Sequence, residues 1–292
     1  MIDADSGLGR ADFYPGALEP PDASNAVYIM PHTLSCFNLL GYNQQRWQEA
    51  GLETPATAWT WNDAIRAAGQ LATAESDGVQ TYGLLLSPSQ VTVLLRGQLA
   101  ASGIDFESLN AEIPAIDSPE VSAAFGRIAD LVAEGVLAPP ALGQNSDGWL
   151  PLLEAQRAGI WSTDMTAQTG FSALDYSVGI ARIGGDYPCT NLGYAASQGT
   201  RHPEAAYRWL AFLSRQGTNT TYSQSIGDIP ARISVAEEVG YWARFDEAST
   251  AILTTVLDDY ARSRRSAEYA ILDPYQTVRF MRALDGAFEE LG

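Results

Sequence analysis

Residues 192–213 read LGYAASQGTRHPEAAYRWLAFL and place a strand directly before a helix. Leu192–Ala196 is a short, largely apolar run, which is typical of a strand. Pro203 and Glu204 then begin a helix, because proline at the first helical position and an acid in the first turn are both favourable there. The helix carries apolar side chains at helical spacing, at Ala206, Tyr207, Leu210, Ala211 and Leu213. This stretch therefore predicts a strand followed by an amphipathic helix.

The same alternation continues along the chain. Short apolar runs predict strands at 27–30, where Pro31 ends the run, and at 82–86, 158–162 and 176–183. Thr60 and Asp63 form a capping box, and Ser118 with Pro119 begins another helix. Further helices are expected at 43–50, 91–101, 150–156, 203–216, 222–225, 235–245, 250–262 and 274–290. Short strands between many helices predict an α/β fold that is rich in helix.

Composition limits the classes of partner and chemistry. The 292 residues hold 35 acidic and 17 basic side chains, a formal net charge of −18. A strongly acidic surface repels phosphate backbones and anionic lipid, so we expect no nucleic acid or membrane-surface partner. The chain has two cysteines and no CxxC pair, which is too few cysteines for a zinc site. The two histidines are far apart in sequence, so a His-rich metal site is excluded, although an all-carboxylate site is not. We expect no metal and no cofactor. No run of apolar residues is long enough to span a bilayer.

Three ordered stretches together resemble the family 1 extracellular solute-binding proteins, the maltose- and multiple-sugar-binding group. The first runs from Tyr42-Asn43-Gln44 through Gly51-Leu52 and Pro55 to Trp59-Thr60-Trp61-Asn62-Asp63. The second is Glu154–Trp161, and the third is the opening stretch continued to Gly227-Asp228-Ile229-Pro230-Ala231-Arg232. No single motif is specific, and the order and spacing of the three carry the resemblance.

The resemblance implies a two-lobe, periplasmic-binding-protein-like fold of type II, with a hinge that the chain crosses more than once. On that template the N-terminal lobe comprises 1–34 plus 190–236, and the C-terminal lobe comprises 35–189 plus 237–292. The βα units that build most of the first lobe in the family are missing, so we expect this lobe to be incomplete. Met1–Gly7 is acidic and is not a signal peptide. We expect a truncated chain, and a naturally reduced form is the alternative.

The resemblance also implies a set of ligand-binding residues in the cleft between lobes. His32 and Thr33 fall in the first hinge crossing, and Ser87, Ser89 and Gln90 lie between a strand and a helix. Segments that match cleft-facing parts of the family contribute Ser162, Asp164, Met165, Gly193, Tyr194, Asp228 and Arg232. Trp149 follows a polar turn at 145–148, and both the cleft and the surface are open for it. No catalytic residue is expected. Cys36 and Cys189 both map to hinge crossings, where a disulfide is one expectation and two buried free thiols are the other.

The expected function is that of a monomeric, non-enzymatic component of an ABC importer that closes on a sugar or oligosaccharide by hinge bending. The partners are the solute and the permease subunits. The expected location is periplasmic or extracellular, with a lipoprotein anchor as one form. A carbohydrate-active hydrolase and a non-transport sensory module are the alternatives, although the chain has no Gly-x-Ser-x-Gly elbow, P-loop or HExxH motif.

Overall fold

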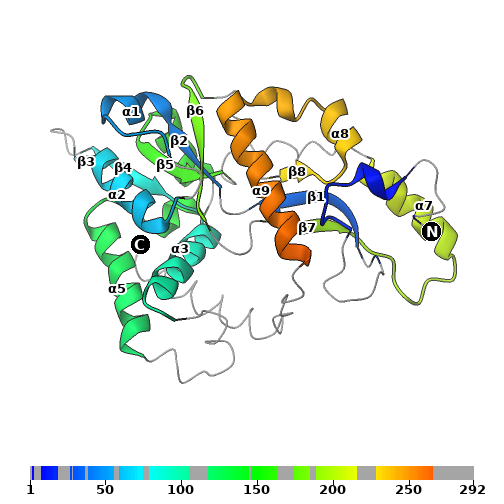
Figure 1. Ribbon diagram of the computed structural model, residues 1–292. Coiled ribbons are helices and arrows are strands. Elements are labelled where there is room, and N and C mark those ends of the chain that lie inside the picture. Colours follow the sequence, from blue (N-terminus) through cyan, green and yellow to red (C-terminus); the bar gives the residue numbers. More distant parts are fainter. Residues whose placement is uncertain are drawn as a thin grey trace. The chain divides into compact units, whose positions relative to one another are not determined.

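The structure is a computed structural model in which two compact units can be described separately (Figure 1). It describes residues 2, 8–18, 27, 29–36, 39–55, 59–74, 79–104, 118–144, 146–163, 174–184, 189–215 and 228–265. Of these, unit 1 takes 2–39 and 184–265, and unit 2 takes 40–183. The helices predicted at 222–225 and 274–290 lie outside the described residues. No helix in the described ranges has the length and apolar character needed to cross a membrane.

Unit 2 is built on a five-stranded sheet of order β3-β4-β5-β2-β6. β4 and β5 are parallel, and β2 runs antiparallel to β5. The strands are β2 (Leu39–Asn43), β3 (Thr73–Ala74), β4 (Gln80–Leu85), β5 (Ala158–Ser162) and β6 (Val178–Arg182). Every residue of β5 is buried, as expected for a strand covered on both faces of its sheet.

Helices cover both faces of the unit 2 sheet. They are α1 (Gln44–Glu49), α2 (Trp61–Leu71), α3 (Pro88–Ala101), α5 (Pro119–Ala133), the 3-10 helix η4 (Pro140–Gly143) and α6 (Ser146–Glu154). Leu84 and Ile160 pack in the cluster that α2, α3 and α5 form, whereas Leu85 and Trp161 pack in a second cluster with α6. Successive strand residues face opposite sides, so the two clusters lie on opposite faces. The predicted capping box at Thr60 and Asp63 begins α2.

Unit 1 is built on a three-stranded antiparallel sheet of order β7-β1-β8. The strands are β1 (Met30–Cys36), β7 (Cys189–Tyr194) and β8 (Asp228–Pro230). The prediction that Pro31 ends a strand was wrong, because β1 continues through Pro31 to Cys36. The register of β1 against β7 shifts between Pro31 and Thr33, and such an irregularity accommodates a proline that cannot donate to the ladder.

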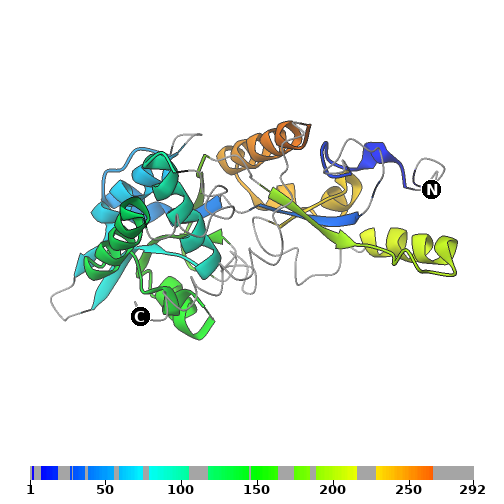
Figure 2. The ribbon, with the colours of Figure 1, turned by 90° about the horizontal axis from the view of Figure 1, so that it is seen from below.

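Helices pack on both sides of the unit 1 sheet. They are the 3-10 helix η2 (Arg10–Asp12), α7 (Pro203–Ser214), α8 (Ile233–Glu238), the 3-10 helix η7 (Trp242–Arg244) and α9 (Glu247–Arg265). Figure 2 shows α7 on the other side of the sheet from α9. The single helix predicted over 235–245 is two pieces, because Gly240 adopts a left-handed φ of 63° that ends α8.

The observed units differ from the predicted lobes at residues 237–265, which the sequence analysis placed in the other lobe. In the structure α9 packs on β7 with a buried apolar face, formed by Leu253, Val256, Leu257, Tyr260 and Ala261. The divisions also fall at 39/40 and 183/184 rather than at 34/35 and 189/190. The α/β class and the helix-rich character are as predicted, and the sheet of unit 1 is the smaller of the two.

Candidate functional site

Two neighbouring parallel strands of unit 2 end in polar side chains. Ser162 is the last residue of β5, and Ser87 follows the end of β4 by two residues. The backbone N–H of Ser87 donates a hydrogen bond to Oγ of Ser162 at 2.9 Å. Gln90 lies in the first turn of α3 and is 3% exposed. The structure thus brings three of the predicted residues together, and we call Ser87, Gln90 and Ser162 the unit 2 cluster.

The unit 2 cluster lies where an α/β sheet offers a ligand site. Ligands of open α/β sheets bind outside the carboxyl ends of parallel strands, next to helix N-termini. Pro88 begins α3, and the side chain of its N-cap residue Ser87 makes no capping hydrogen bond. The three side chains are neutral, so the chemistry available here is hydrogen bonding rather than acid–base catalysis. Thr163 follows Ser162, is buried, and was missed by the sequence analysis, although the Ser-Thr pair after an apolar strand is a usable signal.

Four other residues of unit 2 belong to the predicted binding set. Asp164 and Met165 lie outside the described residues, as does the side chain of Ser89. Trp149 is described, and it packs in the second hydrophobic cluster with Leu153 and Trp161, where it is 5% exposed. Trp149 therefore has a packing role in this cluster, and its inclusion in the binding set stays a prediction.

Four of the predicted residues of unit 1 lie along β1 and β7, namely His32, Thr33, Gly193 and Tyr194. The Thr33 hydroxyl and Nδ1 of His32 are 2.7 Å apart, within hydrogen-bonding distance, and the rings of His32 and Tyr194 meet edge to face with centroids 5.9 Å apart. A Cβ on Gly193 would lie 2.2 Å from the carbonyl oxygen of Met30. Gly193 is therefore needed for the close approach of two strands, a packing role that the sequence does not reveal.

A row of polar residues crosses the unit 1 sheet near the end of β1. Ser35 is directly opposite Thr190 on one side and Asp228 on the other, and all three are half-buried. Directly opposite residues share a face of the sheet, so we call Thr190, Ser35 and Asp228 the unit 1 row. The sequence analysis named Asp228 alone. Ser35 and Thr190 were missed because only the cross-strand register brings them together.

Arg232 has a structural partner in unit 1. Its guanidinium forms an ion pair with Asp12, with Nη2 at 2.5 Å and Nε at 2.6 Å from Oδ2. Asp12 also accepts hydrogen bonds from the backbone and hydroxyl of Ser234. Burial raises the pKa of Asp12, but the hydrogen bonds from Ser234 and Arg232 outweigh it and hold this pKa below its ordinary value. This network ties η2 to the start of α8 and gives Arg232 a structural role, and its assignment to the ligand stays a prediction.

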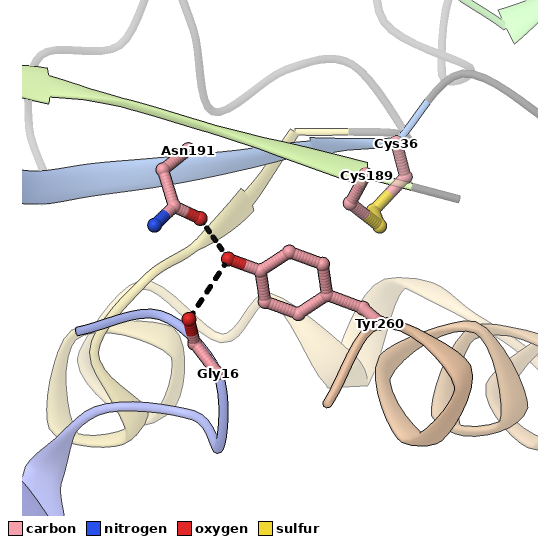
Figure 3. The surroundings of a disulfide bond; sticks show 5 residues. All are labelled: Gly16, Cys36, Cys189, Asn191 and Tyr260. Carbon is pink, nitrogen blue, oxygen red and sulfur yellow. Dashed lines mark hydrogen bonds between the residues drawn. A yellow bond between two sulfur atoms is a disulfide. The ribbon is translucent and has the colours of Figure 1, made fainter. Parts of the chain in front are cut away.

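Cys36 and Cys189 form a disulfide that joins β1 to β7 (Figure 3). The two residues are directly opposite one another in the ladder, with Cα atoms 3.9 Å apart and a sequence separation of 153. The expectation of a disulfide is confirmed, and the alternative of two free thiols is not. The bond lies three residues before the point where the chain passes from unit 1 to unit 2.

In the described ranges, no group of three metal-binding side chains comes together.

Comparisons with known proteins identify a family and a fold. A family model described as "Bacterial extracellular solute-binding protein" matches residues 3–219. No curated protein matches the chain. An ABC substrate-binding protein from Listeria monocytogenes in complex with cycloalternan has a similar structure, with a TM-score of 0.62 and 18% identity. That match covers 99% of this chain and 76% of the Listeria chain.

Two further solved structures are similar over nearly the whole of this chain. An ABC transporter solute-binding protein from Agrobacterium radiobacter K84 in complex with ribitol has a TM-score of 0.66 and 17% identity, covering 97% of this chain and 72% of that chain. The maltose/maltodextrin-binding domain MalE from Bdellovibrio bacteriovorus bound to maltotriose has a TM-score of 0.56 and 16% identity, covering 98% and 73%. These likenesses establish a shared two-lobe α/β fold.

Proposed function

Because the chain belongs to the family of bacterial extracellular solute-binding proteins, we propose that it binds a sugar or a related polyol for an ABC importer. The observation that carries the proposal is the unit 2 cluster at the carboxyl ends of β4 and β5. Hydroxyl and amide side chains both donate and accept hydrogen bonds, as a solute rich in hydroxyl groups requires. Cycloalternan, ribitol, D-mannitol and maltotriose are the molecules bound in four structurally similar proteins.

The unit 1 row is a second set of polar side chains that suits a solute rich in hydroxyl groups. Ser35 and Thr190 contribute hydroxyls and Asp228 contributes a carboxylate acceptor, the group that holds a sugar hydroxyl most strongly. We propose that each set of side chains offers hydrogen bonds to a solute and that the protein works as a hinge-bending binder. His32, Thr33, Gly193 and Tyr194 lie farther along β1 and β7 and act in this proposal as support for the row.

The location and the partners follow from the same proposal. The matching family is one of extracellular proteins, and the Cys36–Cys189 disulfide suits an oxidising compartment. We propose that the protein works as a monomer in the periplasm or at the outer cell surface, with a lipoprotein anchor as one form. The permease subunits of the importer are its proposed protein partners, and the solute is released to them unchanged.

Thermal unfolding with a panel of solutes tests this function. The 292-residue chain is heated alone and with cycloalternan, maltotriose, ribitol or D-mannitol, because a ligand that binds only the folded state raises Tm with concentration. We expect at least one solute to raise Tm while chromatography recovers it unchanged. A rise in Tm accompanied by a shortened oligosaccharide would contradict a transport role and favour a hydrolase.

A further inference from the structure

A groove of about 420 Å³ lies between α2 and α5 in unit 2. Both helices cover the same face of the unit 2 sheet (Figure 1), and α3 packs against each of them. The apolar residues that line the groove are Ile65, Leu131 and Val136. Leu131 belongs to the hydrophobic cluster on this face, and the half-buried Ile65 and Val136 pack against it. This groove, which we call the α2–α5 groove, therefore has an apolar lining that is continuous with the core of unit 2.

Two opposite charges lie on the α5 side of the groove. Arg127 and Glu134 are seven residues apart, so they share one face of the helix and are separated by about 10 Å along its axis. Both side chains are exposed. Neither side chain has an ion pair or a hydrogen bond in the described part of the chain. This side of the groove therefore offers a cation and an anion, two helical turns apart, to a partner.

The α2 side of the groove contains a glycine that the fold itself does not require. Gly69 lies inside α2, where glycine is a poor helix former. Its φ is not left-handed, and a Cβ at this position would meet nothing within 4 Å. A glycine in such a place allows another backbone to come close. Arg66, whose Nη1 is 3.1 Å from Oδ1 of Asp63, adds a second cation to this side.

The rim of the groove favours a protein partner over a small molecule. Small-molecule sites enclose most of the surface of their ligand, whereas the polar and glycine residues of this lining are all exposed, namely Asn62, Arg66, Gly69, Arg127 and Glu134. A protein partner covers such a rim together with the apolar residues beneath it. A helix that lies in a groove presents its anchors at i, i+4 and i+7, and i+7 is the spacing from Arg127 to Glu134.

We propose that the α2–α5 groove binds a helical segment of a protein partner that carries an acidic and a basic side chain two turns apart, with an apolar side chain between them. The acid pairs with Arg127 and the base pairs with Glu134. The apolar side chain packs on Ile65 and Val136. A second copy of the chain fits less well, because two copies that each carry a net charge of −18 repel one another. The groove shares no residue with the unit 2 cluster, so this inference goes beyond the proposed solute site.

A designed helix serves as the probe for this groove. It is a stapled, alanine-based peptide of about 15 residues that contains the run Glu-Ala-Ala-Ala-Leu-Ala-Ala-Lys and a fluorescent label. A second probe has lysine in place of the glutamate. Fluorescence polarisation follows binding to the 292-residue chain at low ionic strength, because salt screens exposed charge pairs. We expect saturable binding of the first probe and roughly tenfold weaker binding of the second.

Matched variants place the probe in the groove. Arg127→Glu is expected to weaken the first probe roughly tenfold and to restore the second, because the charges are then complementary again. Gly69→Leu fills the groove and should weaken both probes. Gly126→Leu, at another exposed helical glycine with open space around it and outside the lining, should bind as the wild type does.

The proposal is overturned if the first probe does not bind saturably, or if Arg127→Glu and Gly69→Leu bind it as the wild type does. A dimer of the 292-residue chain that sedimentation detects and Gly69→Leu abolishes would also overturn it, in favour of a second copy. The rise in Tm with a solute should be the same in Arg127→Glu as in the wild type, so failure of this proposal and failure of the proposed function are distinguishable.

Discussion

The hydroxyl of Tyr260 on α9 hydrogen-bonds to Oδ1 of Asn191 on β7 (Figure 3). The same hydroxyl lies 3.2 Å from the carbonyl oxygen of Gly16, and Nδ2 of Asn191 donates a hydrogen bond to the carbonyl oxygen of Ala17 at 2.6 Å. Three segments far apart in sequence therefore meet at one buried polar point beside the disulfide. This point holds α9 in unit 1, where the sequence alone did not place it.

Removing the Tyr260 hydroxyl tests how much its hydrogen bond to Asn191 stabilises the protein. Tyr260→Phe keeps the ring but leaves Asn191 Oδ1 without this donor, so we expect a loss of about 1–2 kcal/mol in the free energy of unfolding. Chemical denaturation measures the loss. Tyr82→Phe, at a partly buried tyrosine on β4 of unit 2, is the control for a tyrosine elsewhere in the fold. An unchanged unfolding free energy in Tyr260→Phe would show that α9 does not depend on this hydrogen bond.

Reduction of the Cys36–Cys189 disulfide is expected to destabilise the chain by about 2–4 kcal/mol, because the bond restricts the unfolded state across a long loop. Denaturation curves with and without a thiol reductant measure the difference. In the Cys36→Ser, Cys189→Ser double variant the reductant should have no effect. Equal stability of the oxidised and reduced wild type would contradict this prediction.

The Asp12–Arg232 ion pair predicts a specific response to acid. The folded-state pKa of Asp12 is lowered, so the pair stabilises the fold above the unfolded pKa of about 4 and loses this contribution as pH falls below it. Asp12→Asn is expected to lower the free energy of unfolding by about 2–4 kcal/mol at pH 7, because it leaves a buried arginine without its charge partner. The difference in unfolding free energy between wild type and Asp12→Asn should become smaller as the pH is lowered below about 4.

Unfolding free energies of wild type and Asp12→Asn over pH 3 to 7, roughly the titration range of a carboxyl group, measure this response. Asp258→Asn, at an exposed position of α9, is the control and should follow the wild type. A constant difference between wild type and Asp12→Asn across the range would contradict the assigned role of the carboxylate.

The unit 2 cluster predicts where a solute-binding defect arises. Gln90→Ala removes an amide from the first turn of α3, and we expect affinity for the solute to fall about tenfold, the equivalent of one lost hydrogen bond to a polar ligand. Gln98→Ala lies on the same helix and should bind as the wild type does. Calorimetric titration of both variants measures the difference. Equal affinities would remove the cluster from the site.

Local signals predicted the elements that depend on neighbouring residues. The strand expected at 158–162 is β5 with the same bounds, and the capping box at Thr60 begins α2 as expected. Ser87 and Ser162 were each named in the sequence analysis, but only the parallel pairing of β4 with β5 brings them together in the unit 2 cluster.

Features that depend on distant pairing were not accessible from the sequence. The continuation of β1 through Pro31 rests on a shifted register against β7, and the placement of α9 rests on contacts across about 70 residues, as between Tyr260 and Asn191. The unit 1 row was missed for the same reason, since Ser35 meets Thr190 and Asp228 only through cross-strand register. The burial of Trp149 likewise follows from tertiary packing.

Isothermal titration of the 292-residue chain with maltotriose, cycloalternan, ribitol and D-mannitol tests the central claim most directly. The account predicts saturable binding of at least one of them with a stoichiometry of one, and recovery of that solute unchanged after the titration. An absence of binding heat and of any shift in Tm for every solute, or the release of hydrolysis products, would contradict it.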